Sequence, residues 1–455
     1  MAQTITCTEL LALPILSPLP ILPALPAKLV ATMAEPSEQE KNEYYFGLPS
    51  KPRLVARSNF ATPWSQEWSD GWVARKFISI IGKLDVVQDI LDKYDPDKII
   101  ACLGNVDWTT IDVIRIGTEQ TTSDPIILWV GVVPGSLSWQ EGDKIACRCR
   151  KVLLEAGLDI HCEIRESIVK RTVSTIPLQE GKVPSLSAML GGQAIAAERT
   201  PTKEGTLGLY LLAGGVQCAL ASRHVVGEDN HSSLSGQHVI MPGQTMYKAI
   251  CNQQKEDLAA CATQDDTEAC RKLGTHLSHL EELSSRRIGQ ILFSPPRVPT
   301  TRAGYRNPWL PDYALIALDK GRLCDSLSNA VQVHVSLGQL QLMKKYHPNL
   351  TQPTESLRLG GTFTPGDQRV VGNVERVAGT NGWVLHGVIV PLERHVFFSL
   401  NGDSGSAVFD LDGRVGGIID AGSGSNYPWL DLTYITPMEW IIEDIEIKVG
   451  PVSFL

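Results

Sequence analysis

Hydrophobic and polar positions follow two different patterns along this chain, and the change of pattern divides it into two parts. In residues 41–171, apolar runs predict strands, one stretch has helical spacing, and one stretch alternates. In chain order these segments are TTIDVIRIG (109–117), PIILWVGVV (125–133), WQEGDKIACRCRKVLLEAG (139–157) and the alternating Ile160, Cys162 and Ile164. GKLDVVQDILDKYD predicts a short helix before them, which ends before Pro96. The order β-β-α-β indicates an α/β module of unknown role.

The second part reads as all β. Thr, Ser, Pro, Gly and Ala dominate 172–206, which predicts a linker, and from 207 to 450 short apolar runs alternate with turns. These runs are LGLYLLAGG, VQCALASRHVV, HVIMP, IGQILFS, DYALIALD, QRVVGNVERVAG, GWVLHGVIVP and GSAVFDLDGRVGGIID. Many short strands with Gly and Pro between them are typical of a sandwich or a barrel. We expect this part to fold without the N-terminal module.

One insertion, about 247–285, breaks the β pattern. Leu273, Leu277 and Leu280 share one helical face, and Asp265 with Glu268 resembles a capping box that starts a second helix. The pattern predicts a helical hairpin on the surface of the β domain.

Composition narrows the class of protein. A length of 455 residues with 43% hydrophobic residues predicts a globular chain of two to four domains. The net charge of −9 argues against a nucleic-acid partner, and nucleotide-binding glycine motifs are absent from the sequence. We expect no cofactor and no metal. The competing possibility is a metal site formed by Cys251, Cys261, Cys270, His276 and His279.

The first 40 residues form an apolar extension with five prolines between residues 14 and 26, and its first basic residue is Lys28. Proline at this density is incompatible with a spanning helix, so we expect no membrane partner. A secretory signal fits poorly because the charged start and the unbroken apolar centre are missing. We therefore predict a cytoplasmic protein, with secretion as the alternative and with Met1 or Met33 as the start.

Candidate chemistry begins at NGDSGSAVF (401–409), where Ser404 stands between glycines before an apolar run. This segment is either an ordinary turn or a nucleophile on a strained loop, and a nucleophile needs a base and a group that orients the base. His224 follows an apolar strand, and Asp312 leads into one, where a desolvated carboxylate needs a partner. Each of the two could instead be structural.

In the order His224, Asp312, Ser404, the motifs ALASRHVV, PDYALIALD and NGDSGSAVF resemble those of chymotrypsin/trypsin-like serine peptidases. GGIIDAG and YITPMEWIIEDI resemble the wall strand of the substrate pocket and the closing helix of that family. The resemblance covers about 206–447 and implies a double β-barrel. The whole chain, including EYYFGL, also resembles uncharacterised fungal proteins with a trypsin-like C-terminal domain.

The resemblance implies that Ser404 is the nucleophile, His224 the general base and Asp312 its orienting partner. It places the oxyanion hole at the backbone N–H groups of Gly402 and Ser404.

It also places Phe398, Asp420 and Gly422 at the substrate pocket, with Phe398 as an apolar floor. Asp420 departs from the family because relatives carry a small neutral residue beside the triad aspartate, and two close carboxylates disfavour joint ionisation. The family's new Ile-Val-Gly-Gly N-terminus has no counterpart before the barrel, which makes activation by cleavage there doubtful.

Two functions therefore compete. The first is a serine endopeptidase that acts on polypeptides through an acyl-enzyme. The second is a peptidase fold with little or no turnover that serves as a binding or signalling module, and a non-peptidase hydrolase or an unrelated β protein is a third reading. The N-terminal module is a candidate for binding an unknown protein.

Overall fold

The computed structural model describes residues 35–455 except for 60–63, 65–67, 70–71, 80, 82–83, 120–123, 173–192, 228–232, 263–280, 302–306, 321–326, 332–356, 363–372, 377–381, 392–393, 411 and 426–428. Residues 36–455 form one compact unit. This part of the chain is mostly β, with several sheets and few helices, as the hydropathy pattern predicts. Among the described residues, no helix has the length and apolarity needed to cross a bilayer.

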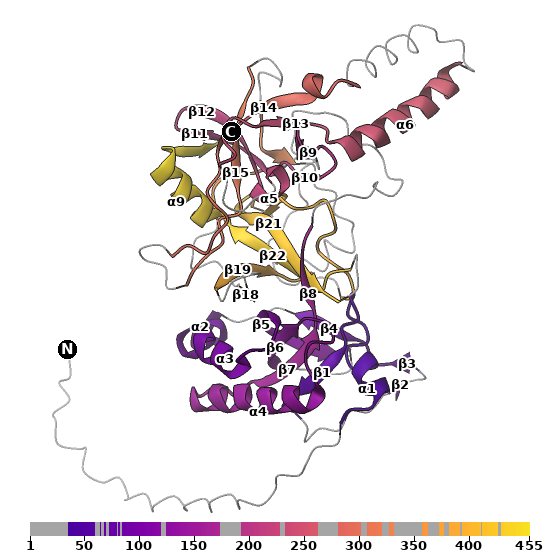
Figure 1. Cartoon of the computed structure of the whole chain (residues 1–455), viewed down its shortest axis with the longest axis vertical. Coiled ribbons are helices and arrows are strands. Elements are labelled where there is room, and N and C mark those ends of the chain that lie inside the picture. Colours follow the sequence, from indigo (N-terminus) through magenta and orange to yellow (C-terminus); the bar gives the residue numbers. More distant parts are fainter. Residues whose placement is uncertain are drawn as a thin grey trace, which may run out of the picture. The chain divides into compact units, whose positions relative to one another are not determined.

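An 11-stranded sheet contains strands from both parts of the chain (Figure 1). Its order is β1-β7-β6-β5-β18-β19-β22-β21-β20, with β4 paired to β5 and β8 paired to β21. The strands are β1 (Leu54–Arg57), β4 (Lys76–Ser79), β5 (Trp108–Thr118), β6 (Ile126–Val132), β7 (His161–Glu166), β8 (Ile168–Arg171), β18 (Asn373–Arg376), β19 (Trp383–Ile389), β20 (Ala407–Phe409), β21 (Val415–Gly424) and β22 (Leu432–Pro437). The parallel pair β6 and β7 is connected by a helix, as a parallel crossover requires.

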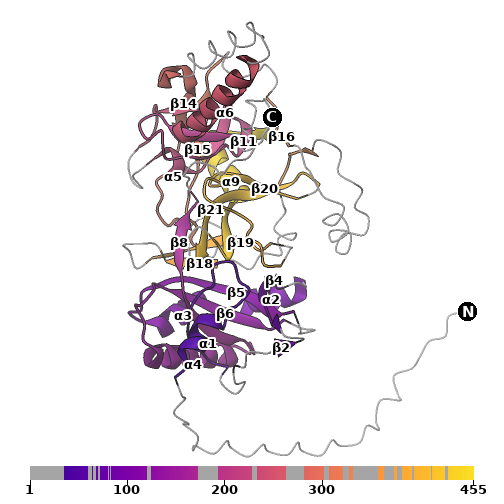
Figure 2. The ribbon, with the colours of Figure 1, turned by 90° about the vertical axis from the view of Figure 1, so that its right-hand side faces the viewer.

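In the described residues of the N-terminal part there are four helices. Helix α4 packs on β1 and β7 (Figure 1) and on α3, which lies beside it in both views (Figure 2). The four helices are α1 (Glu38–Glu43), α2 (Leu84–Lys93), α3 (Pro96–Leu103) and α4 (Trp139–Glu155). The α4 helix begins where the Ser138 side chain accepts a hydrogen bond from the Glu141 N–H. Pro96 separates α2 from α3 and itself starts α3, where a proline ring fits because no intrahelical N–H is needed.

A second, eight-stranded sheet has the order β10-β9-β13-β14-β15-β12-β11-β23. Its strands are β9 (Ala194–Ala197), β10 (Gly205–Thr206), β11 (Leu209–Ala213), β12 (Val216–Ala221), β13 (His238–Ile240), β14 (Arg287–Phe293), β15 (Ala314–Leu318) and β23 (Val452–Phe454). Two further pairs join β2 (Trp68–Ser69) to β3 (Trp72–Val73) and β16 (Ala330–Val331) to β17 (Leu357–Arg358). The other helices among the described residues are α5 (Arg223–Val226), α6 (Gln244–Ala262), the 3-10 helix η1 (Leu283–Arg286) and α9 (Met438–Lys448).

One apolar cluster is shared between the N-terminal and C-terminal parts. It contains Tyr45 and Trp129 from the first part with Ala421, Leu432 and Tyr434 from the second, all buried. The aromatic rings of Tyr45 and Trp129 pack edge to face. Because apolar burial is the main stabilising contribution to a fold, this shared cluster argues against separate folding of the two parts.

A buried polar cluster reinforces the same junction. The Arg165 guanidinium lies over the Trp129 ring, 3.5 Å from Asp431 and 3.7 Å from Asp112. The Ser50 N–H donates a 2.8 Å hydrogen bond to Asp431. Removing either part would leave buried charges without their partners, which is costly.

The strands predicted in the β part are all present, and α2, α4, β5, β6 and β7 match their predicted segments. The range 172–206 differs from the predicted linker, because β9 and β10 lie within it. Their apolar runs are too short to stand out from the surrounding Gly, Pro and Thr. In the insertion, α6 starts at Gln244, and the predicted second helix lies outside the described residues, as do Cys270, His276 and His279.

Candidate active site

The pairing of β12 with β15 brings His224 and Asp312 together. These strands are antiparallel, with Ala221 opposite Ala314. The chain continues from β12 into the single turn of α5, which carries His224, and Asp312 stands just before β15. In an antiparallel pair the end of one strand faces the start of the other, so the register places both residues at the same edge of the sheet.

His224 lies between Asp312 and Ser404. Its Nδ1 is 2.6 Å from Oδ2 of Asp312, and its Nε2 is 2.8 Å from Oγ of Ser404. The other oxygen of Asp312 accepts the backbone N–H of His224 at 2.9 Å. An ionised carboxylate can only accept hydrogen bonds, so Nδ1 carries the proton and Nε2 is left to accept the one from Ser404. The three residues predicted from the sequence therefore meet at hydrogen-bonding distance.

The loop that carries Ser404 is fixed by glycines and by β10. Gly402 and Gly405 have φ angles of 98° and 95°, which side chains other than glycine rarely adopt. A Cβ on Gly405 would also lie 2.3 Å from the Thr206 carbonyl oxygen. The Thr206 N–H donates to the Ser404 carbonyl at 2.7 Å, and its hydroxyl donates to that of Gly402 at 2.8 Å. The strained loop suggested by the sequence is thus held in place by a neighbouring strand.

Asp403 stabilises the same loop from within the chain. Its carboxylate accepts the N–H of Leu400 at 2.8 Å, and its carbonyl accepts that of Ser406 at 2.9 Å. Burial raises the pKa of Asp403, although the Leu400 N–H opposes this shift. These bonds form within residues 400–406, so the loop is held without a newly generated N-terminus.

Two backbone N–H groups converge on one carbonyl oxygen. Those of Gly402 and Ser404 both donate to the Thr172 carbonyl, at 2.5 and 3.2 Å. The Thr172 hydroxyl lies 2.9 Å from Oγ of Ser404, and both residues are fully buried. The pair of donors predicted as an oxyanion hole therefore binds an oxygen of the protein's own chain.

Thr172 directly follows β8, which lies beside β21 (Figure 1). Strand β8 runs antiparallel to β21, with Arg171 opposite Ala421, Lys170 opposite Gly422 and Val169 opposite Ser423. Gly422, which was expected at the substrate pocket, thus pairs with a strand from the N-terminal part.

Five charged groups surround the triad. The Arg171 guanidinium lies 3.0 Å from Asp420 and 2.8 Å from Glu375. Arg297 Nε lies 2.8 Å from Oδ2 of Asp312, the oxygen that faces the imidazole. His386 lies 2.9 Å from Glu375 and 3.3 Å from Asp420. Apart from Arg171 and Arg297, which are partly exposed, these groups are buried, so each charge depends on its neighbours for compensation.

The carboxyl groups differ in acidity. Burial alone would raise the pKa of Asp312, but His224 and Arg297 hold it well below its usual value. Burial also opposes the ionisation of Glu375, and Arg171 and His386 outweigh it and lower its pKa to about 2.

For Asp420, burial and the nearby Asp312 raise the pKa despite the cations around it. The Arg171 guanidinium, 3.0 Å from Asp420, compensates part of the predicted repulsion between Asp420 and Asp312.

Two sets of side chains are close enough to share a cation: His224, Asp312 and Asp420, and Glu375, His386 and Asp420. A metal at either set would approach the guanidinium groups of Arg171 or Arg297, which already compensate these carboxylates. The donor sets fit a network of ion pairs better than a metal centre.

Phe398 is the residue predicted as the floor of the substrate pocket. Phe398 is 45% exposed, whereas its neighbour Ser399 is buried, with its Oγ 2.7 Å from Oγ1 of Thr433. Phe398 therefore stands at the surface, where part of its ring faces solvent.

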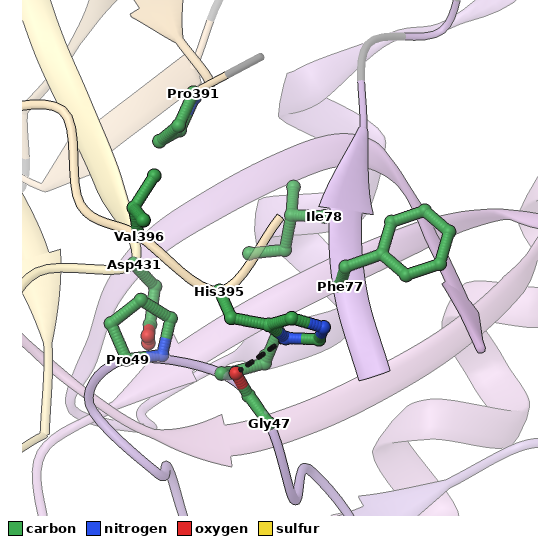
Figure 3. A pocket seen from close by; sticks show the side chains of 9 residues that line it. Gly47, Pro49, Phe77, Ile78, Pro391, His395, Val396 and Asp431 are labelled. Carbon is green, nitrogen blue, oxygen red and sulfur yellow. Dashed lines mark hydrogen bonds between the residues drawn. The ribbon is translucent and has the colours of Figure 1, made fainter. Parts of the chain in front are cut away.

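A separate pocket lies between β4 and the segment that carries His395 (Figure 3). His395 Nδ1 is 3.1 Å from the Gly47 carbonyl, and Phe77 and Ile78 form the opposite wall. None of its lining residues belongs to the triad or to the ionic groups around it.

Sequence reasoning missed Arg171, Thr172, Arg297, Glu375 and His386. The only signal was a charged or titratable residue next to apolar positions, as in ESIVKRT and GWVLHGVIV. Such residues are usually solvated. The pairing of β8 with β21 and of β18 with β19 brings four of them into the site, and Arg297 reaches Asp312 from the segment after β14.

Comparisons with known proteins add little. No model of a protein family matches the sequence, and no curated protein matches it. A solved structure, described as a glutamic-acid-specific serine protease that uses a histidine triad in substrate binding, matches 59% of this chain and 100% of its own. It has 13% identical residues and a TM-score of 0.28. At this score the likeness carries no argument, and the resemblance to fungal proteins stays a prediction.

Proposed function

We propose that this chain is a serine endopeptidase that hydrolyses polypeptides through His224, Asp312 and Ser404. The observation that carries the proposal is the hydrogen-bonded order Asp312, His224, Ser404 beside two N–H groups that converge on a single carbonyl oxygen. A nucleophile, a base, an orienting carboxylate and an oxyanion hole are the parts that acyl transfer requires.

In the proposed reaction, His224 Nε2 takes the hydroxyl proton of Ser404 as Oγ attacks the substrate carbonyl. The Gly402 and Ser404 N–H groups stabilise the developing oxyanion, and Asp312 stabilises the imidazolium. His224 then protonates the leaving amine, and water hydrolyses the ester by the same steps in reverse. Arg297 holds Asp312 in its ionised form throughout.

The domain layout and the partner of the N-terminal module are inferred from the sequence. We infer that 207–450 forms a trypsin-like double barrel, with the 41–171 module in front of it as a candidate site for an unknown protein partner. Location in the cytoplasm stays a prediction.

One observation favours the alternative, a peptidase fold without turnover that serves in binding. Arg297 contacts the same Asp312 oxygen as the imidazole. Its positive charge compensates the carboxylate that should stabilise the imidazolium, which weakens the base.

Labelling with a fluorophosphonate probe tests the proposal, because the probe reacts with activated serines. We expect Ser404 to be labelled, with Ser404→Ala abolishing the label and His224→Ala reducing it roughly 10⁴-fold or more. Ser406→Ala, two residues along the same loop, is the matched control and should label as the wild type does. Because the Thr172 carbonyl occupies the oxyanion hole, Lys170→Pro, which weakens the pairing of β8 with β21, is labelled in parallel. Absence of label at Ser404 in both the wild type and Lys170→Pro, under conditions that label a known serine hydrolase, would favour the binding module.

A further inference from the structure

The segment that fills the candidate site has the geometry of a bound substrate. A peptide that adds a strand to a sheet edge is recognised through its main chain, with pockets for alternate side chains. Strand β8 does this along β21, over Ile168–Arg171. Where the pairing ends, the Thr172 carbonyl lies in the proposed oxyanion hole, and the nucleophile lies against the same residue.

Arg171, the residue before Thr172, is bound by two carboxylates of the β part. The Arg171 side chain reaches Asp420 and Glu375, two buried carboxylates on β21 and β18. A buried carboxylate without a partner is costly, so an arginine at this position of the segment stabilises the site as well as itself. Asp420, which departs from the residue type expected there, is explained by Arg171.

We propose that the protein cleaves its own chain between Thr172 and Val173, with Asp420 and Glu375 as the recognition site for Arg171. This inference rests on the proposed peptidase activity and assigns its first substrate. It predicts a preference for arginine followed by a small residue on the acyl side of the cleaved bond.

The step needs no reactant other than water. Ser404 Oγ forms a bond to the carbonyl carbon of Thr172, and its proton passes to His224 Nε2. The bond to the Val173 nitrogen breaks as His224 returns that proton to the leaving amine. Water then hydrolyses the ester, which gives a chain that ends in the Thr172 carboxylate and a chain that begins at Val173.

The bond after Thr172 can be cleaved within one molecule, because β8 belongs to the same chain as Ser404. The rate should therefore be first order and independent of protein concentration, unlike cleavage between two molecules. After cleavage, the pairing of β8 with β21 and the ion pairs of Arg171 keep the new end in the site as a bound product.

The experiment follows the full chain after purification by intact mass and N-terminal sequencing. We expect wild-type protein to yield fragments that end at Thr172 and start at Val173, and Ser404→Ala to stay intact. Thr172→Trp should slow cleavage about 100-fold or more by displacing the carbonyl, whereas Thr301→Trp, the matched control at an exposed position outside the site, should leave the rate unchanged.

Arg171→Lys is a milder variant in case Thr172→Trp does not fold. It keeps the charge but loses the planar fork that spans both carboxylates, and should slow cleavage roughly tenfold or more. Lys170→Pro removes a backbone donor from β8 and should free the site, which would speed fluorophosphonate labelling of Ser404 while slowing self-cleavage.

The outcomes separate the two proposals. An intact wild-type chain with a labelled Ser404 in the wild type or in Lys170→Pro overturns self-cleavage and leaves the peptidase proposal standing. Cleavage after Thr172 that persists in Ser404→Ala also overturns self-cleavage, because another protease must cause it. If Ser404 takes no label in the wild type or in Lys170→Pro, and neither protein is cleaved, both proposals fail.

Discussion

Glu375 couples β8 to the rest of the site through one buried side chain. It faces Arg171 on one side and His386 on the other. The Arg171 charge and the His386 hydrogen bond lower the pKa of Glu375 to about 2, although burial opposes its ionisation. The ordinary value is 4.5. A carboxyl group more acidic in the folded state than in the unfolded state stabilises the fold wherever it is ionised in both.

The stabilisation by Glu375 should decrease as the pH falls. The contribution of Glu375 is complete above about pH 4.5 and is lost as pH falls toward 2. In the uncleaved Ser404→Ala background, Glu375→Gln should lower the free energy of unfolding by roughly 2–3 kcal/mol at pH 7, and by less at pH 3.5. Urea unfolding at both values measures this. Exposed Glu446→Gln is the control, and an equal loss for Glu375→Gln at the two pH values would contradict the ion-pair account.

At the scale of single elements, helix α6 packs on the β domain through its first turns and then continues for several more turns. Met246 and Ile250 in its first turns are buried, and the Met246 N–H donates to Glu204 at 3.2 Å. The Tyr247 ring lies under the Arg286 guanidinium. The first two turns therefore belong to the β domain, although the sequence placed the whole insertion on the surface.

Two replacements by a short Gly/Ser turn separate these parts. The sequence predicts a surface hairpin for most of 253–280, so replacing this range should leave the melting temperature within a few degrees. Replacing 244–280 removes two buried apolar side chains, each worth about 2–5 kcal/mol when truncated, and should lower it strongly. Differential scanning calorimetry in the Ser404→Ala background compares them, and equal melting temperatures would show that the base is dispensable.

Helices and strands with a clear periodicity of apolar residues could be predicted from the sequence. The long helix α4 and the strands of the β part have clear periods, and the triad residues stand next to strands of recognisable type. Strand β8 has no such signature, because IVKR alternates only partly and owes its place to β21. The exposure of Phe398 was equally hard to predict, since it depends on how its loop folds. The proximity of His224, Asp312 and Ser404 could thus be predicted from the sequence, whereas the position of Thr172 against Ser404 could not.

The whole molecule depends on contacts between segments far apart in the chain. Strand β5 pairs with β18, β8 pairs with β21, and the shared apolar cluster joins Trp129 to Tyr434. Cleavage after Thr172 would cut the connection between the parts without removing any of these contacts. The cleaved protein should remain one assembly of two chains, whose dissociation would expose Asp431 and Arg165 without their partners.

A shortened chain that starts at Val173 tests this dependence. It lacks β1 to β8, so the apolar faces of Ala421, Leu432 and Tyr434 lose their cover. Because exposed apolar patches of this kind promote aggregation, we expect it to be insoluble alone. Co-expression with a separate chain of residues 35–172 should restore a soluble complex that elutes as a single species in size-exclusion chromatography. Replacing Arg165 in that second chain with leucine should weaken the rescue, since Asp112 and Asp431 would be buried without their cation. If the shortened chain is instead soluble alone and melts cooperatively, the β part folds independently, and the shared cluster is an interface between two domains.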